Sequence, residues 1–195
     1  MRPAGNCGAG PCRKRESAGS VDVLVVVRME LCVAAATDTG KVRTQNQDTC
    51  VVERLPAWPD AWLLAVADGM GGHHGGQVAS RLAVDTLRSV LFAHSQERPS
   101  LHLLRNAFHE ANRRLLEAAA ADPLLDGMGT TLTAAVWHGS QLLIAHVGDS
   151  RAYRINRRVC EQLTNDHSLV AEMVRRGDLR WEEARFHPQR HLLLR

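Results

Sequence analysis

The chain has 195 residues, of which 45% are hydrophobic and only 4% aromatic, a composition typical of a soluble globular protein with one sizeable core. The net charge of +3 is spread along the chain apart from a basic cluster at residues 13–15, which argues against a nucleic-acid partner. The longest aliphatic run, residues 23–27, is far shorter than the roughly 20 residues that a membrane span requires. The five cysteines have neither the number nor the spacing of a disulfide framework or a zinc site, so we expect a reducing cytoplasm.

The N-terminal segment differs in composition from the rest. Residues 1–20 are rich in Gly, Pro, Ser and Arg and have almost nothing to bury. We therefore expect residues 1–28 to be a disordered leader or an over-long gene start, with Met29 as the natural first residue. The domain is expected over residues 29–195, and residues 30–36 are predicted to form its first strand.

The predicted elements then alternate in groups. Two strand-like runs, 49–55 and 61–67, flank the sequence PAWPD and predict a hairpin. Apolar residues at three- and four-residue spacing predict helices over 77–92 and 101–118, with Ser100 as the N-cap of the second. Residues 130–155 return to strands, and a short helix follows at 168–176. This order favours antiparallel sheet with helices packed outside over a doubly wound parallel sheet.

Several aspartates lie at predicted strand ends. Asp residues favour turns, and Asp38 is assigned to one. Asp68 and Asp149 each end a strand that is predicted to be buried on both faces, so their charges need a partner, and a cation is the simplest. The glycines after Asp68 would let the chain turn sharply and expose a backbone carbonyl as a second oxygen ligand. Oxygen ligands suit Mg²⁺ or Mn²⁺.

Other interpretations of the glycine-rich segment are less consistent with its spacing. No Lys-Ser/Thr pair follows the last glycine, as a Walker loop requires, and position 74 is His where a dinucleotide-binding loop needs Gly. His73 and His74 are adjacent and have no cysteine nearby, which favours solvated loop histidines over a zinc site.

Six segments together carry a family resemblance. In chain order they resemble the signature segments of the metal-dependent protein phosphatases, the PPM or type 2C family, in their bacterial form. They are TDTGKVRTQNQD (37–48), LLAVADGMGGHHGGQVAS (63–80), GMGTTLTAAV (127–136), LLIAHVGDSRAYRI (142–155), LTNDHS (163–168) and HPQRHLLLR (187–195). The resemblance implies an α+β fold, a four-layer α-β-β-α sandwich of two antiparallel sheets flanked by helices, of which residues 29–195 are expected to form the larger N-terminal part, incomplete at the C-terminus.

The resemblance also implies a function and a site. The expected activity is that of a protein serine/threonine phosphatase with two Mn²⁺ or Mg²⁺ ions and a third metal site. By similarity Asp68 bridges two metals, Asp48 and the Gly69 carbonyl are further ligands, Asp149 supports the third site and Arg43 binds the substrate phosphate. The expected substrates are phosphorylated proteins, the products of a serine/threonine kinase. The complete protein is expected to be a cytoplasmic monomer without a nucleic-acid or membrane partner.

Three departures from the family pattern weaken this expectation. Gln47 stands where the family commonly has Glu, which predicts weaker metal retention. Met70 follows the Asp-Gly pair where many eukaryotic members have a proposed proton donor, so that role does not transfer to His73. The family's later Ser-Asp-Gly and Asp-Asn segments lie beyond the last matched segment, so the 195-residue chain alone is expected to bind metals weakly. The alternative is a catalytically inactive fragment that binds phosphoproteins or a kinase.

Overall fold

The computed structural model describes residues 31–72, 74–94 and 98–194. The fold below is that of one compact unit, Val33–Arg195. The leader expected over residues 1–28, and His73, lie outside the described residues. Within the described ranges, no helix combines the length and the hydropathy needed to cross a membrane.

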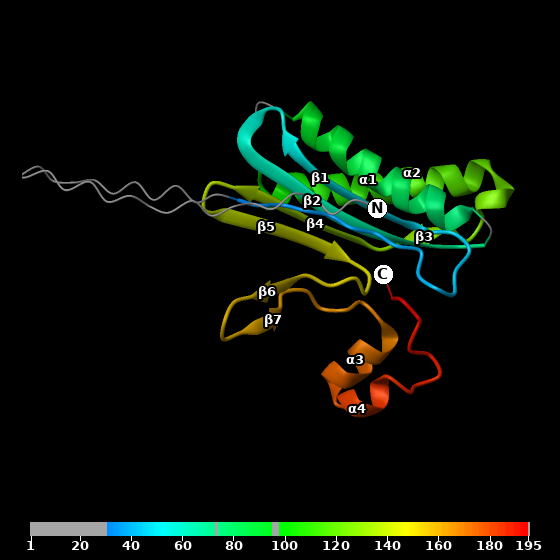
Figure 1. The fold of residues 1–195 in the computed structure, drawn as a ribbon. Helices are drawn as coiled ribbons and strands as arrows, with labels where there is room; N and C mark the ends of the chain where they lie inside the picture. Colours follow the sequence, from blue (N-terminus) through cyan, green and yellow to red (C-terminus); the bar gives the residue numbers. More distant parts are fainter. Residues whose placement is uncertain (1–30, 73, 95–97, 195) are drawn as a thin grey trace, which may run out of the picture. The chain divides into compact units, whose positions relative to one another are not determined.

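A five-stranded antiparallel sheet organises the unit (Figure 1). The strands follow the order β1-β2-β4-β5, and β3 pairs with the end of β2. The predicted hairpin is present as β1 and β2, but its turn takes only residues 56–57, because Trp58 already pairs with Leu55. The strand bounds are β1 Asp48–Leu55, β2 Trp58–Met70, β3 Gly129–Thr130, β4 Leu132–His138 and β5 Gln141–Val147.

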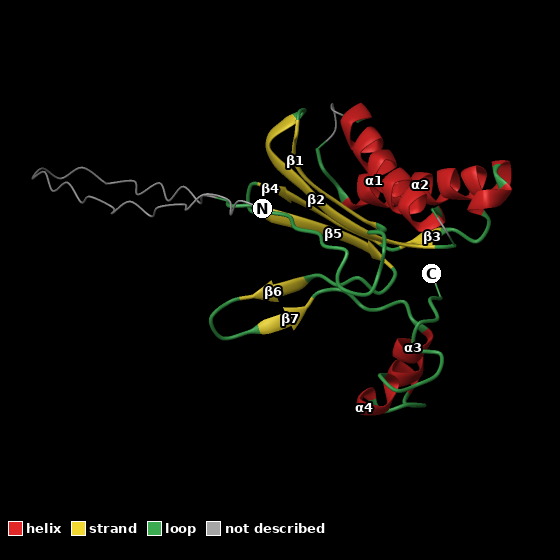
Figure 2. Cartoon of the chain, turned by 45° about the vertical axis from the view of Figure 1, so that its right-hand side comes forward, coloured by secondary structure: helices red, strands yellow, loops and turns green. Residues whose placement is uncertain are grey.

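Two amphipathic helices, α1 (Gly75–Ala93) and α2 (Leu101–Ala121), cover one face of this sheet (Figures 1 and 2). Both helices were predicted from their apolar spacing. Ser100 caps α2 as predicted, because its side-chain oxygen accepts a hydrogen bond from the Leu103 N–H at 3.2 Å. The core forms between these helices and the sheet, and its largest fully buried apolar side chains are Leu55, Leu63, Leu87, Leu91, Leu104 and Val136.

The elements that follow β5 lie on the side of the sheet away from α1 and α2 (Figures 1 and 2). Strands β6 (Tyr153–Ile155) and β7 (Cys160–Gln162) form a separate antiparallel pair. Two short helices follow, α3 (Leu169–Arg176) and α4 (Trp181–Ala184). Beyond α4 the chain returns to the start of α3, where Ser168 and Leu193 form an isolated antiparallel bridge.

The α+β class with two antiparallel sheets is confirmed. The described residues supply a helical layer, a five-stranded sheet and a two-stranded sheet. The strand predicted at residues 30–36 is wrong in its described part, because residues 31–39 have no regular structure. No strand of the described chain lies beside this segment, so its backbone groups have no ladder partners there.

Candidate active site

Asp48 and Asp68 lie opposite one another at one end of the β1–β2 hairpin. The antiparallel register pairs them directly across the two strands, and residues paired in this way project their side chains from the same face of the sheet. Along β2, alternation buries Leu63, Ala65 and Ala67 under the helices. The same alternation directs Asp68, and with it Asp48, toward the opposite face.

Gly69 follows Asp68 where β2 meets the first turn of α1. A Cβ atom at Gly69 would lie 1.9 Å from the carbonyl oxygen of Gly76, and one at Gly76 would lie 2.8 Å from the carbonyl oxygen of Gly69. The Gly69 N–H also donates to the carbonyl oxygen of Gln47 at 3.2 Å. These two glycines are therefore required by a backbone-to-backbone contact that their spacing in the sequence does not reveal.

Asp149 lies in the loop between β5 and β6, and this loop contacts the end of β2 through Thr131. Gly148 has a φ of +106°, and a Cβ atom there would lie 2.6 Å from Cγ2 of Thr131. The Thr131 hydroxyl shares a hydrogen bond of 2.7 Å with that of Ser150 and accepts another from the Asp68 N–H at 2.9 Å. One threonine thus fixes both Asp68 and the loop of Asp149.

An open cleft of ≈ 450 Å³ brings all of the predicted site residues together. Arg43, Asp48, Asp68, Gly69 and Asp149 line it. Partial burial raises the pKa of Asp68 above its ordinary value, and the charge of its cross-strand neighbour Asp48 raises it further. The charge of Asp149 adds to this rise in the pKa of Asp68, while Arg43 opposes it. The cleft is therefore a place where negative charge is concentrated beside one guanidinium.

The three predicted carboxylates, Asp48, Asp68 and Asp149, form a pair and a separate third member. In the part of the chain that the structure describes, no three His, Cys, Asp or Glu side chains are gathered closely enough to hold one metal ion. Asp48 lies directly opposite Asp68 across the two strands, whereas Asp149 comes from a separate loop and affects Asp68 through its charge. Proteins commonly bind Mg²⁺ through one or two carboxylates with water in the other positions, and Mn²⁺ prefers the same oxygen donors. The donor set therefore fits a hard divalent cation.

Several cleft residues were not predicted. Asp38 makes the predicted turn, since its Oδ1 accepts from the Gly40 N–H at 2.7 Å, but it lines the cleft as well. His191 and Leu193 also line the cleft. They arrive there because the Leu194 N–H donates to the carbonyl oxygen of His167 at 2.8 Å, a pairing of distant segments that local spacing does not reveal.

Comparisons with known proteins identify the class to which this fold and cleft belong. The profile of the family described as Protein phosphatase 2C matches residues 39–187. The chain therefore belongs to the protein phosphatase 2C family.

Individual relatives agree with this assignment. The serine/threonine phosphatase stp of Listeria monocytogenes is 42% identical over 167 residues, which cover 82% of this chain and 64% of that protein. The crystal structure of the serine/threonine phosphatase PstP/Ppp of Mycobacterium tuberculosis is 38% identical, with a TM-score of 0.71, over 83% of this chain and 66% of that one. The catalytic domain of PstP in complex with two manganese ions is 37% identical, with a TM-score of 0.66, over 77% of this chain and 62% of that one.

The match is partial in length. The chain spans 64% of the length of the Listeria phosphatase.

Proposed function

We propose that this protein is a metal-dependent phosphatase that removes phosphate from phosphoserine and phosphothreonine in proteins. The observation that supports this most is the Asp48–Asp68 carboxylate pair beside Arg43 in one open cleft, within a fold of the protein phosphatase 2C family. The names of the relatives support serine/threonine specificity.

The cleft residues divide into two proposed metal-holding groups. Asp48, Asp68 and the carbonyl oxygen of Gly69 would hold two divalent cations, and Asp149 would support a third. The two manganese ions in the PstP structure support Mn²⁺, with Mg²⁺ as the chemically similar alternative. When bound, such cations lower the pKa of water to near neutrality and neutralise charge on phosphoryl oxygens.

Arg43 is the proposed phosphate-binding residue. It is exposed and lines the same cleft as the carboxylates. Its planar guanidinium can bind two phosphate oxygens at once, which a lysine ammonium cannot do equally well. Because its charge already acts on Asp68, a phosphoryl group held by Arg43 would lie beside the proposed metal ligands.

The proposed substrates and setting follow from this chemistry. Phosphorylated proteins would be the substrates, and a serine/threonine kinase would produce them. A reducing cytoplasm suits the free cysteines Cys32, Cys50 and Cys160 of the described chain. The relatives' names support phosphoprotein substrates.

Hydrolysis of a phosphothreonine peptide tests the proposal. Because the chain spans 64% of the Listeria phosphatase, the assay uses this chain extended by the C-terminal part of that relative. We expect Mn²⁺-dependent release of phosphate, reduced by Asp68→Asn to the level found without metal. Arg43→Ala should lower kcat/KM by about 100-fold, comparable to removing one preorganised charge-stabilising donor, and Arg43→Lys should lower it less.

A matched control exists within the chain. Asp126 begins a second Asp-Gly-Met-Gly tetrapeptide, at residues 126–129, and is exposed in a turn. Asp126→Asn should therefore leave hydrolysis unchanged. A folded, extended chain that shows no Mn²⁺-dependent hydrolysis, or equal activity in the Asp68→Asn variant, would contradict the proposal.

A further inference from the structure

The loop that contains Asp149 is hydrogen-bonded to the segment that follows β7. The His167 N–H donates to the carbonyl oxygen of Gly148 at 2.8 Å, and the Gly148 N–H donates to Nδ1 of His167 at 3.3 Å. On the other side of Asp149, the Ala152 N–H donates to the hydroxyl of Thr164 at 3.1 Å. Residues 148–152 are thus bonded to one segment at both ends.

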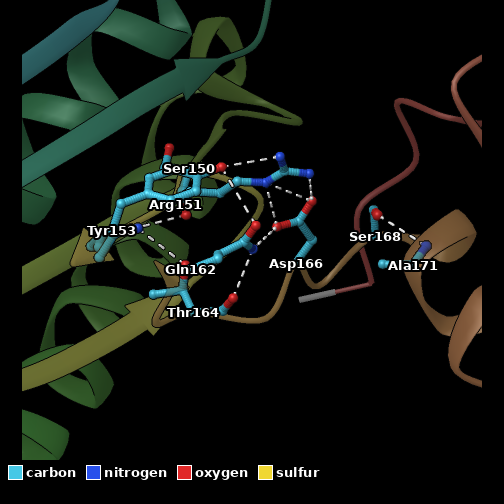
Figure 3. Close-up of polar contacts among 10 residues, drawn as sticks. Ser150, Arg151, Tyr153, Gln162, Thr164, Asp166, Ser168 and Ala171 are labelled. Atoms are coloured by element: carbon cyan, nitrogen blue, oxygen red, sulfur yellow. Dashed lines mark hydrogen bonds and ion pairs between the residues drawn. The ribbon is translucent and has the colours of Figure 1, made fainter. Parts of the chain in front are cut away.

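Between these two ends, Arg151 and Asp166 form an ion pair (Figure 3). Nε of Arg151 lies 2.9 and 3.1 Å from the two carboxylate oxygens of Asp166, and Nη2 lies 2.6 Å from Oδ2. Gln162 donates a further hydrogen bond to Asp166 at 3.1 Å. The Asp166 side chain is only 10% exposed, so this pair is less screened by water than a surface pair. An Arg–carboxylate pair with forked hydrogen bonds fixes the relative orientation of the two side chains as well as their distance.

The same guanidinium contacts two further elements. Nη1 of Arg151 donates to the Tyr153 hydroxyl in β6 at 3.3 Å, and its Cζ lies 5.7 Å from the centre of the Trp181 ring at the start of α4. One side chain therefore connects the Asp149 loop to β6, α4 and the segment after β7.

The Asp149 loop needs such a restraint because of its charge. Residues 148–152 have no regular secondary structure. Asp149 shares the cleft with three other carboxylates, those of Asp38, Asp48 and Asp68, and acts on Asp68 with the same sign of charge. Without a cation, this repulsion favours withdrawal of Asp149 from the cleft. A loop held at both ends and at Arg151 keeps Asp149 in place before metal binds.

We propose that Arg151 and Asp166 are positioning residues that hold Asp149 at the cleft in readiness for a divalent cation. This inference rests on the proposed function, because it presumes that Asp149 contributes to metal binding. Arg151 and Asp166 contact neither metal nor phosphate in this proposal. They affect metal binding only through the position of Asp149.

Mn²⁺ binding to the purified 195-residue chain tests the inference, with unbound Mn²⁺ measured by electron paramagnetic resonance. Arg151→Gln and Asp166→Asn should each weaken binding by about tenfold, as is typical for partners that orient metal ligands. In an Asp149→Asn background neither change should weaken binding further. A general structural defect would instead lower the affinity in both backgrounds.

Three controls sharpen this comparison. Arg154→Gln breaks the nearby but exposed Arg154–Glu161 pair of the β6–β7 hairpin and should leave Mn²⁺ affinity unchanged. Arg151→Lys keeps the charge but loses the fork, so its affinity should be intermediate. Thermal unfolding in EDTA checks that each variant is folded. If Arg151→Gln does not fold, Asp166→Asn, which keeps the side-chain shape, is used alone for the comparison between the wild-type and Asp149→Asn backgrounds.

The possible failures are distinguishable. If Asp149→Asn leaves Mn²⁺ binding unchanged, the metal role of Asp149 is wrong and the positioning role falls with it. If Asp149→Asn weakens binding but Arg151→Gln and Asp166→Asn do not, only the positioning role is overturned. Equal losses in both backgrounds would also overturn it, because the effect would then not pass through Asp149.

Discussion

At the scale of single residues, Gly69 has the tightest requirement in the cleft. Its missing side chain lets the end of β2 touch the first turn of α1, where a Cβ atom would lie 1.9 Å from the Gly76 carbonyl oxygen. The clash is with backbone, so no rotamer change can relieve it. The position of Asp68 therefore depends on the packing of the residue that follows it.

This contact predicts a large effect for Gly69→Ala. Overpacking against a rigid neighbour should lower the free energy of unfolding by about 3 kcal/mol. Gly72→Ala is the matched control, because a Cβ atom at Gly72 meets nothing within 4 Å and the residue is exposed, and it should change stability by less than about 0.5 kcal/mol. Urea unfolding of both variants measures the difference, and similar losses for the two glycines would contradict the packing argument.

The sequence allowed the charged centre of the cleft to be predicted, but not its supports. Asp68 and Asp149 stand out because a carboxylate follows an apolar strand, which is a local signal. Thr131 has no such signal, since its hydroxyl matters only through its contacts with the Asp68 backbone and Ser150. Arg151 and Asp166 likewise form a pair only once β6 and β7 have folded back on each other.

At the scale of elements, α1 is joined to the start of β1 by a buried hydroxyl. Ser80 of α1 is fully buried, and its Oγ donates to the Gln47 carbonyl oxygen at 2.7 Å. The same Oγ lies 2.9 Å from the Thr49 hydroxyl. These two partners flank Asp48, so the helix helps to fix the strand end that carries this carboxylate.

Ser80→Ala should therefore destabilise the domain. Removal of a buried hydroxyl from its partners should cost about 1 kcal/mol or more. Ser89→Ala in the same helix is the control, because the Ser89 hydroxyl is exposed and bonds only within α1, to the Asp85 carbonyl at 2.8 Å. Thermal unfolding of the two variants is the measurement. Helix propensity favours Ala over Ser, so Ser89→Ala should not destabilise α1. A loss for Ser89→Ala as large as that for Ser80→Ala would contradict the role of the Ser80 contact.

Helices were more predictable than strands for a physical reason. The periodicity of α1 and α2 is a property of each segment alone, and the Ser100 cap lies one residue before its helix. A strand also needs a neighbouring strand, which local composition does not reveal. The apolar residues 30–36 predict a strand, but no described strand lies beside residues 31–36. The β1–β2 pairing was predictable because its two strands are adjacent in sequence.

At the scale of the whole described unit, the fold places charge and core on opposite sides of one sheet. The helices α1 and α2 cover one face, and the Asp48–Asp68 pair projects from the other. The alternate apolar residues of β2 occupy the face under the helices, so Asp68 must project from the opposite face, beside Asp48. Folding therefore brings these like charges together. The metal-free cleft is thus destabilising, and a cation would remove that cost.

The raised pKa of Asp68 determines how the stability of the metal-free protein changes with pH. Because folding raises its pKa, the folded state disfavours the ionised carboxylate. The metal-free protein therefore loses stability as the pH rises through this pKa and regains it as the pH falls. A cation needs the ionised form, so stabilisation by Mn²⁺ should shrink as the pH falls toward the raised pKa.

Thermal unfolding of the 195-residue chain with EDTA or with Mn²⁺ at pH 7 tests the central claim, that Asp68 is the main metal ligand of the cleft. At a Mn²⁺ concentration of about 100 Kd, binding should stabilise the wild-type chain by ~2.7 kcal/mol. Asp68→Asn should unfold at a higher temperature than wild type in EDTA and gain nothing from Mn²⁺, while Asp126→Asn should respond as wild type does. Equal Mn²⁺ stabilisation of the wild type and Asp68→Asn would contradict the claim.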